Sequence, residues 1–290
     1  MTYDNFKKTV KSKLADYLPA TVTPKFIKIT KNNDQNFDGL VLQTSKSTAA
    51  PTLYFNDLYV DYCRGLSMEH ILETIADIYS RYTDSAISVE NFTDFEIVKK
   101  HLCLKLINKK LNSDYLKNIP HRDYCDLALV CAYYDKITQC PSISTITKKQ
   151  FELWNITEDE LFKTAAATSP DVIKPVIEDL FTMLSRKYNL DAGFEPPIPM
   201  YFISNDDNYY GAICMTYTGI LRDLADKFDE NLAVIPSSVH EVLVLPCASI
   251  DELGAITNMV KQVNVESVKP GDVLSDHAYF YDRSTGLLSY

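Results

Sequence analysis

Pairs of apolar segments in this 290-residue chain are separated by turns that are too short to hold a helix. Five residues separate Leu232–Ile235 from Glu241–Leu245, and five separate His277–Tyr281 from Leu287–Tyr290. Two parallel strands need a crossover of about a dozen residues, so strands this close must pair antiparallel. The chain is predicted to be an α/β protein of the α+β type, with mixed or antiparallel sheets and helices packed on one face. A doubly wound parallel sheet is disfavoured.

Apolar residues that recur every three or four positions predict helices, and Phe6, Val10, Leu14 and Leu18 form such a stripe. Capping boxes, in which Ser or Thr precedes Glu by three residues, predict helix starts at Thr93, Thr157 and Ser249. The other expected helices are Met68–Tyr82, Lys148–Trp154, Glu158–Ala167, Val176–Lys187, Ile220–Phe228 and Ile250–Val263, the last with Leu253, Ile256, Val260 and Val263 facing inward.

Runs of β-branched, aromatic or continuous apolar residues predict the strands. The polar sequence Asn32–Asp34 is expected to be a turn between two of them. Besides the four strands named first, those expected are Thr21–Ile29, Gly39–Gln43, Thr52–Phe55, Leu102–Ile107, Leu127–Tyr134, Met200–Ser204 and Gly211–Tyr217.

The segment Asp191–Pro199 contains three prolines in four positions, which block a helix and favour an extended linker. We therefore expect two lobes, residues 1–194 and 200–290, joined by a linker at 195–199. The C-terminal lobe is expected to follow the order ββαββαββ. Similar Asn/Asp-rich turns followed by Gly in 29–41 and 203–213 suggest an internal hairpin–helix duplication; recurrent turn chemistry is the alternative explanation.

The charge of the chain disfavours nucleic acid as a partner. Its formal net charge is −10, whereas proteins that bind phosphate backbones carry a basic face. The densest basic cluster is placed at Lys105, Lys109 and Lys110. Anionic membrane surfaces are disfavoured for the same reason.

The expected location is the cytoplasm. The N-terminal residues lack the apolar stretch of a signal peptide, and no run of about 18 apolar residues could span a membrane. Seven cysteines, an odd number without a C-x-x-C pair, favour a reducing compartment and buried thiols.

His121–Asp123 has the sequence His-Arg-Asp of the protein-kinase catalytic loop. That loop also requires an Asn five residues after the Asp, and Ala128 stands there. The tripeptide is therefore predicted to be a helix-to-strand junction.

Pro236–Glu241 brings together a serine, a histidine and a carboxylate, which are the components of an activated nucleophile. Neighbouring residues of a strand point to opposite faces, so His240 and Glu241 cannot both face Ser238 in an extended segment. A polar turn is the favoured interpretation, and a ligand-binding turn formed by Ser237, Ser238 and His240 is the alternative. Scattered histidines and the absence of a Gly-rich phosphate loop predict no metal and no cofactor.

Several short sequence segments, taken in order, resemble those of a family from clostridia and other Firmicutes that is known as domain of unknown function 5688. They are Thr30–Asn33 with Asp38–Leu40, Asn118–Arg122, Trp154–Leu161, Leu232–Val242 and Val273–His277. The resemblance covers almost the whole chain and implies a cytosolic bacterial protein. It implies no activity, cofactor or catalytic residue.

Two functions are expected from these observations. The favoured one is a non-enzymatic binding or adaptor protein, which engages a protein or a small-molecule ligand through an aromatic-rich acidic surface. The alternative is a hydrolase whose site combines residues from distant parts of the chain, namely His121, Asp123, Ser238, His240 and Glu241. Hydrogen bonding among these side chains in a concave pocket distinguishes the two.

Overall fold

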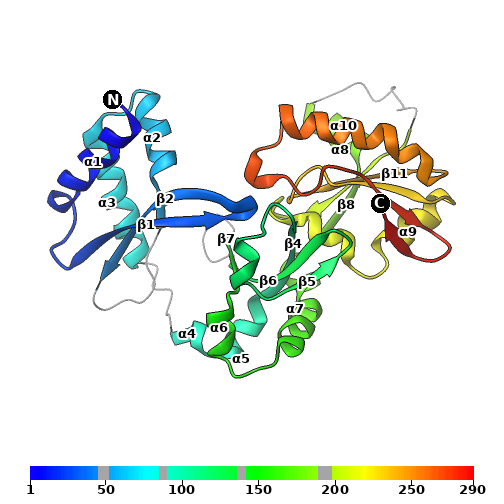
Figure 1. Cartoon of the computed structure of the whole chain (residues 1–290), viewed down its shortest axis with the longest axis horizontal. Helices are drawn as coiled ribbons and strands as arrows, with labels where there is room; N and C mark the ends of the chain where they lie inside the picture. The colour runs from blue at the N-terminus through cyan, green and yellow to red at the C-terminus, as the bar shows by residue number, and fades with distance from the viewer. Residues whose placement is uncertain (45–51, 85–89, 136–141, 189–197) are drawn as a thin grey trace. The chain divides into compact units, whose positions relative to one another are not determined.

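The computed structural model describes residues 1–44, 52–84, 90–135, 142–188 and 198–290 of the chain (Figure 1). These residues form two compact units, one containing 1–31 and 35–94 and the other containing 32–34 and 95–290. Neighbouring strands among the described residues pair antiparallel in three sheets. The predicted fold class, an α+β chain with antiparallel sheets, is confirmed.

The first unit is a three-stranded sheet with helices packed against it. Its strands lie in the order β1 (Val22–Lys31), β2 (Gln35–Thr44) and β3 (Thr52–Tyr54). Its helices are α1 (Tyr3–Lys13), α2 (Phe55–Cys63), α3 (Met68–Asp84) and α4 (Glu90–Thr93). The predicted stripe of α1 is buried, together with apolar side chains of β2 and α3, namely Leu40, Leu42, Ile71, Leu72 and Ile75.

The turn predicted at Asn32–Asp34 is present between β1 and β2. Asn33 and Asp34 have φ angles of 58° and 49°, which Asn and Asp tolerate better than most residues with a Cβ. These three residues belong to the second compact unit.

The second unit contains a four-stranded sheet. Its strands are β4 (Leu102–Asn108), β5 (His121–Tyr124), β6 (Leu127–Asp135) and β7 (Ser142–Thr145), and β6 pairs with each of the other three. The nearby helices are α5 (Phe95–Val98), α6 (Lys148–Glu152) and α7 (Glu158–Val172). The Ser169 hydroxyl of α7 accepts a hydrogen bond from the Leu104 N–H at 2.7 Å, which joins the helix to β4.

The same unit contains a six-stranded sheet in the order β13-β12-β10-β11-β9-β8. The strands are β8 (Pro175–Asp179), β9 (Tyr201–Asn205), β10 (Leu232–Ile235), β11 (Val242–Pro246), β12 (Tyr279–Asp282) and β13 (Leu287–Ser289). The helices are α8 (Leu180–Tyr188), α9 (Ile220–Phe228) and α10 (Leu253–Glu266). In α10, Leu253, Ile256 and Val260 pack inward as predicted, but Val263 is exposed, so that part of the prediction is wrong.

Two predicted elements are wrong. Val176–Lys187 was expected to be a helix, but its first residues form β8, and α8 begins only at Leu180. Pairing of Val176–Asp179 with β9 overrides the helical pattern, as tertiary pairing often overrides local propensity. Gly211–Tyr217 was expected to be a strand, but Gly211–Thr216 forms a 3₁₀ helix. The second copy of the proposed duplication is therefore not a hairpin.

The capping-box predictions have three different outcomes. Thr157 caps α7, and its hydroxyl accepts a hydrogen bond from the Glu160 N–H at 3.1 Å. Thr93 is the last residue of α4 and does not begin a helix. Ser249 precedes the 3₁₀ turn Ile250–Glu252 without a side-chain capping bond, because the chain enters α10 through that turn. Sequence analysis missed the capping box of Thr147 and Gln150 at α6.

The compact units divide the chain at a different place from the expected linker. β8 precedes residues 195–199 and β9 follows them, yet these two strands pair in one sheet. Residues 195–197 lie outside the described part of the chain. The expected linker at 195–199 therefore stays a prediction.

The two outcomes at Thr157 and Ser249 can be compared by mutation. We expect Thr157→Ala to lower the free energy of unfolding by about 1 kcal/mol, because it removes the acceptor for an orphan N–H of α7. Ser249→Ala should change it by less than about 0.5 kcal/mol. Urea unfolding followed by circular dichroism measures both, and equal losses would contradict the assignment of a single cap.

Candidate functional site

An open groove of about 730 Å³ lies on the six-stranded sheet beside α8. It is lined by side chains from β8, α8, β9 and two loops, namely Val176, Glu178, Met183, Arg186, Lys187, Phe202, Asn205, Asp206, Asn208 and Glu241. Its volume falls in the range of about 300–1,000 Å³ that is typical of ligand pockets. The groove is the candidate functional site.

The floor of the groove follows from the register of four strands. Glu178, Phe202, Leu243 and Ile235 stand opposite one another in turn on β8, β9, β11 and β10, so they share one face of the sheet. Ile235 packs against the core cluster that includes Leu253 of α10. α10 therefore covers this face at β10, while the face at β8 and β9 lines the groove.

Charged groups of both signs, Glu178 among them, surround the apolar part of this floor. Glu178 and Arg186 form a two-pronged ion pair, with both N–O distances at 2.9 Å. Lys187 of α8 contributes a second cation, and Asp206 and Glu241 contribute carboxylates from the loops. The apolar floor and mixed rim suit a ligand that has both apolar and charged parts.

The loop after β9 is held in place by hydrogen bonds between the Asn205 side chain and the backbone of the loop. The Asn205 side chain accepts from the Tyr209 N–H at 2.9 Å and donates to the Tyr209 carbonyl at 3.0 Å. Asn208 and Tyr210 have φ angles of 49° and 55°, which turn the chain sharply into the 3₁₀ helix that begins at Gly211. Residues of this loop therefore line the groove in a fixed geometry.

The predicted turn Pro236–Glu241 lies beside this loop, and its serine is internal. Ser238 is buried, and its hydroxyl accepts from the His240 N–H at 2.9 Å. The Ser238 N–H donates to the Glu241 carbonyl at 3.2 Å. These bonds close the turn between β10 and β11 and place Glu241 on the rim of the groove.

Both nitrogens of the His240 ring are engaged, and two tyrosine rings contact it. Its Nδ1 accepts from the Tyr210 N–H at 3.1 Å, so its proton is on Nε2, which lies 3.5 Å from an Asp272 oxygen. That neighbour lowers the pKa of the Asp272 carboxyl below its usual value. Tyr209 stacks on the ring and Tyr210 meets it edge-on. Neither ring nitrogen contacts the Ser238 hydroxyl, so the two do not form a nucleophile–base pair.

His121 and Asp123 lie on β5, in the other sheet of the unit. The His121 Nδ1 donates to the Ile119 carbonyl at 3.0 Å, and Asp123 pairs with Lys109 at 2.7 Å. The tripeptide follows the 3₁₀ helix Tyr115–Asn118, in agreement with the predicted helix-to-strand junction. None of the hydrogen bonds and ion pairs of these two side chains reaches Ser238, His240 or Glu241.

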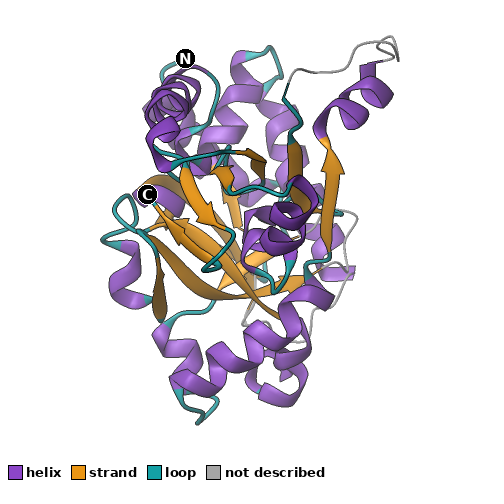
Figure 2. Cartoon of the chain, turned by 90° about the vertical axis from the view of Figure 1, so that its right-hand side faces the viewer, coloured by secondary structure: helices purple, strands orange, loops and turns teal. Residues whose placement is uncertain are grey.

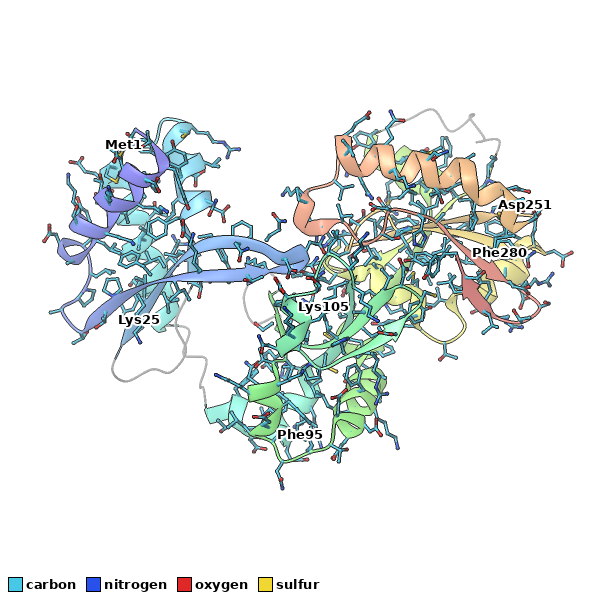
Figure 3. The ribbon with its side chains drawn as sticks, in the orientation of Figure 1. Met1, Lys25, Phe95, Lys105, Asp251 and Phe280 are labelled. Carbon is cyan, nitrogen blue, oxygen red and sulfur yellow. The ribbon has the colours of Figure 1, made fainter. Side chains whose placement is uncertain are left out.

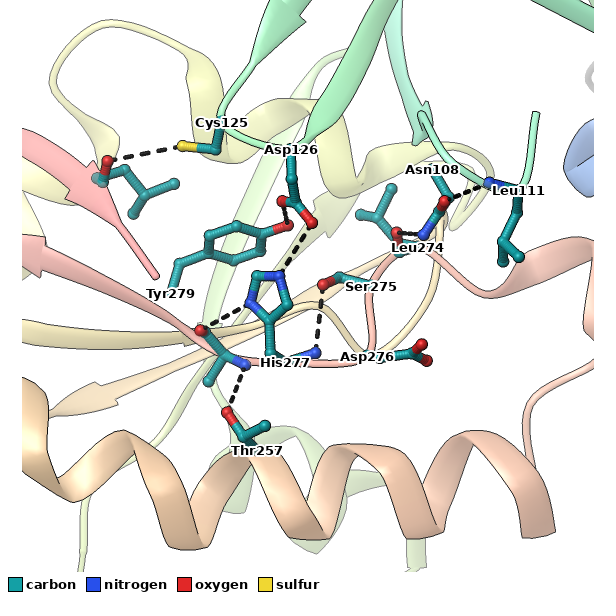
Figure 4. Close-up of polar contacts among 12 residues, drawn as sticks. Asn108, Leu111, Cys125, Asp126, Thr257, Leu274, Ser275, Asp276, His277 and Tyr279 are labelled. Atoms are coloured by element: carbon teal, nitrogen blue, oxygen red, sulfur yellow. Dashed lines mark hydrogen bonds and ion pairs between the residues drawn. The ribbon is translucent and has the colours of Figure 1, made fainter. Parts of the chain in front are cut away.

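Sequence analysis missed a titratable cluster around His277 (Figure 4). Asp126 stands at the turn between β5 and β6, and His277 lies two residues before the start of β12. The Asp126 carboxylate accepts from His277 Nε2 at 3.0 Å and from the Tyr279 hydroxyl at 2.6 Å. His277 and Asp126 are 151 residues apart in sequence, so spacing alone could not predict the pair.

Both ring nitrogens of His277 face oxygen atoms. Nε2 faces the Asp126 carboxylate, and Nδ1 faces the Ala278 carbonyl at 3.1 Å. Both oxygens can only accept, so the arrangement favours the protonated ring, in which both nitrogens donate. The bond to Asp126 raises the pKa of His277 above 6.5. Burial alone would raise the pKa of Asp126, but hydrogen bonds from His277 and Tyr279 lower it. With both nitrogens engaged, the ring is suited to an ion pair with Asp126.

The described residues contain no group of three or more His, Cys, Asp or Glu side chains that could hold a metal ion. Among these residues, no helix combines the length and the apolar character needed to cross a bilayer. The expected absence of a cofactor stays a prediction.

Comparison with known proteins gives a family and no function. The model of one family, described as a family of unknown function (DUF5688), matches residues 3–283. No curated protein and no solved structure matches the chain. The family match names no organism, so the expected bacterial origin stays a prediction.

Mutation can distinguish the contributions that the two serines of the Pro236–Glu241 turn make to stability. We expect Ser238→Ala to cost about 1–2 kcal/mol of unfolding free energy, because it leaves the buried His240 N–H without its acceptor. Ser237→Ala should cost less than about 0.5 kcal/mol, since this half-buried side chain forms no hydrogen bond with the residues that the structure describes. Chemical unfolding of both variants is the measurement. A stable Ser238→Ala protein would show that this hydroxyl does not support the turn.

The His277–Asp126 pair predicts a pH-dependent stability. Because the folded-state pKa of His277 is raised, its stabilising contribution is complete below pH 6.5 and is lost as the pH rises through the raised value. His277→Gln should therefore cost more at pH 5.5 than at pH 9. The difference should be about 0.5–1 kcal/mol, because solvent partly screens a pair whose side chains are 21% and 33% exposed. His70→Gln is the control, since His70 is exposed on α3. A cost independent of pH would contradict the ion pair.

Proposed function

Since the chain belongs to a family of unknown function, we propose its role from geometry: it is a non-enzymatic binding protein whose groove beside α8 takes an extended peptide segment of a partner protein. The observation that carries the proposal is the groove itself, which combines an apolar floor with a rim of both charges. Its partly exposed floor residues Val176 and Phe202 offer apolar area to a ligand.

The position of β8 favours a peptide over a compact small molecule. β8 is the last strand of its sheet and pairs only with β9 among the strands that the structure describes. Figure 2 shows this edge strand running directly into α8. Backbone groups along the outer side of an edge strand can pair with an added strand, and side chains of that strand alternate into neighbouring pockets. Val176 and Glu178 place the groove at this edge.

The rim supplies the selectivity of the proposed site. Arg186 and Lys187 of α8 stand on one wall, while Glu241 comes from the β10–β11 turn. The fixed turn that contains Ser237, Ser238 and His240 supports Glu241, so these residues act on the ligand mainly through its position. Rigid elements that hold polar groups in place reduce the entropy lost on binding.

The hydrolase alternative finds no support in the arrangement of its five residues. The Ser238 hydroxyl faces a backbone N–H and not the His240 ring, whose nitrogens face Tyr210 and Asp272. An activated serine needs a base within hydrogen-bond reach of its hydroxyl. We therefore propose binding without catalysis.

A matched pair of variants on β8 tests the groove. Val176 lines the groove, whereas the adjacent Ile177 points to the other face and is 41% exposed. Peptides enriched from a random phage-displayed library on the full chain should bind Val176→Lys at least about tenfold more weakly, because a buried ammonium is costly. Ile177→Lys should bind them as the unmodified chain does. Fluorescence anisotropy with labelled synthetic copies measures both.

Two results would contradict the proposal. One is enrichment of peptides that bind Val176→Lys and the unmodified chain equally well. The other is the absence of enriched peptides together with a small molecule that native mass spectrometry finds on the purified chain, which would assign the groove to a small ligand. Circular dichroism of both variants confirms that they fold.

A further inference from the structure

The first residues of the chain are basic, although the chain as a whole is acidic. Residues 1–31 contain seven lysines and two aspartates, a formal charge of +5, and the remaining residues therefore carry −15 of the total of −10. The cluster that sequence analysis placed at Lys105, Lys109 and Lys110 does not form a basic surface. Lys105, labelled in Figure 3, is buried on β4. Lys109 pairs with Asp123. The concentrated positive charge lies on α1 and β1.

A small pocket of about 190 Å³ opens among these lysines, within the first compact unit. Its lining combines three ammonium groups, one carboxylate and an apolar floor, namely Lys7, Lys11, Lys28, Asp38, Phe26, Ile27, Gly39 and Phe55. The sequence folds to this arrangement because Lys28 of β1 stands directly opposite Asp38 of β2. Lys7 and Lys11 are four residues apart and share one face of α1.

Asp38 fixes two of the three ammonium groups. Its carboxylate lies 2.6 Å from the Lys28 Nζ and 2.7 Å from the Lys7 Nζ, and it accepts from the Tyr3 hydroxyl at 3.1 Å. The bonds from Lys28 and Lys7 hold the pKa of Asp38 well below its usual range, so the carboxylate stays charged. Lys7 also lies 3.3 Å from the exposed Asp4.

Lys11 is the third ammonium group, and it has no carboxylate partner among the described residues. Its Nζ lies 4.5 Å from the centre of the Phe26 ring, which orients the side chain toward the pocket. The lining therefore carries three positive charges against one negative charge. Lys28 retains two N–H donors beyond its bond to Asp38, and Lys11 retains three.

We propose that this lysine pocket binds a phosphate group. A phosphate monoester or inorganic phosphate carries about 1.5–2 negative charges at pH 7, which matches the excess of two positive charges, and lysine is a common phosphate ligand. The volume equals the share of about six water molecules, so the pocket accommodates a small anion after dehydration.

The test is isothermal titration calorimetry of the full chain with inorganic phosphate, at constant ionic strength maintained with sodium chloride. Lys11→Gln should weaken binding about tenfold, the effect expected when one charge-assisted hydrogen bond is lost. Lys13→Gln, which removes an exposed lysine of the same helix outside the pocket, should bind as the unmodified chain does. This pair of variants changes net charge equally, so a difference between them reports the pocket.

A second arm distinguishes the source of the phosphate. Phosphatidylcholine vesicles that contain phosphatidic acid replace inorganic phosphate in a flotation assay with the same variants. Capture that depends on Lys11 would assign the pocket to a lipid headgroup, and phosphate binding without capture would assign it to a soluble phosphate. No binding in either arm, or equal binding by Lys11→Gln and Lys13→Gln, would overturn the proposal. The groove proposal concerns the other unit and is unaffected by this result.

Discussion

The geometry of the groove depends on one close backbone approach, at Gly211. A Cβ at this position would lie 2.4 Å from the Ser204 hydroxyl, 2.6 Å from the Asn205 nitrogen and 2.7 Å from the His240 carbonyl. Only a residue without a side chain permits the 3₁₀ helix to pack against both β9 and the β10–β11 turn. The approach brings the Tyr210 N–H to the His240 ring and fixes the loop that lines the groove. Sequence analysis assigned Gly211 to the start of a strand, because Gly after an Asn/Asp-rich segment is also typical of hairpins.

The antiparallel architecture could be predicted because it follows from local spacing. The segments Leu232–Ile235 and Ile220–Phe228 match β10 and α9, since short apolar runs between turns leave few alternatives. β8 could not be predicted in the same way. Its partner β9 begins more than twenty residues later in the chain, and the apolar residues after Val176 fit a helical stripe equally well. Only pairing in three dimensions decides between the two.

The two histidine sites show why a site is harder to predict than a fold. His240 drew attention because Ser238 and Glu241 stand near it in sequence, yet its ring serves to pack and orient the turn. His277 forms the stronger ion pair with a residue from a different sheet. Proximity in sequence constrains local turns, whereas the protonation of a side chain depends on groups that the fold brings together. The candidate residues His121 and Asp123 illustrate the same limit, because their partners are the Ile119 carbonyl and Lys109.

The net charge of the whole chain is a poor guide to what one part of it binds, and the lysine pocket illustrates the physical reason. Exposed charges farther apart than the Debye length, about 8 Å at physiological ionic strength, are largely screened from each other. The acidic total of the chain therefore does not set the potential at Lys11. The potential there depends on the few charges within that distance, and Asp38 is the only carboxylate in the lining. An acidic chain can thus carry a basic site. A negative net charge argues more strongly against binding an extended phosphate backbone, which needs many cations, than against binding a single phosphate group.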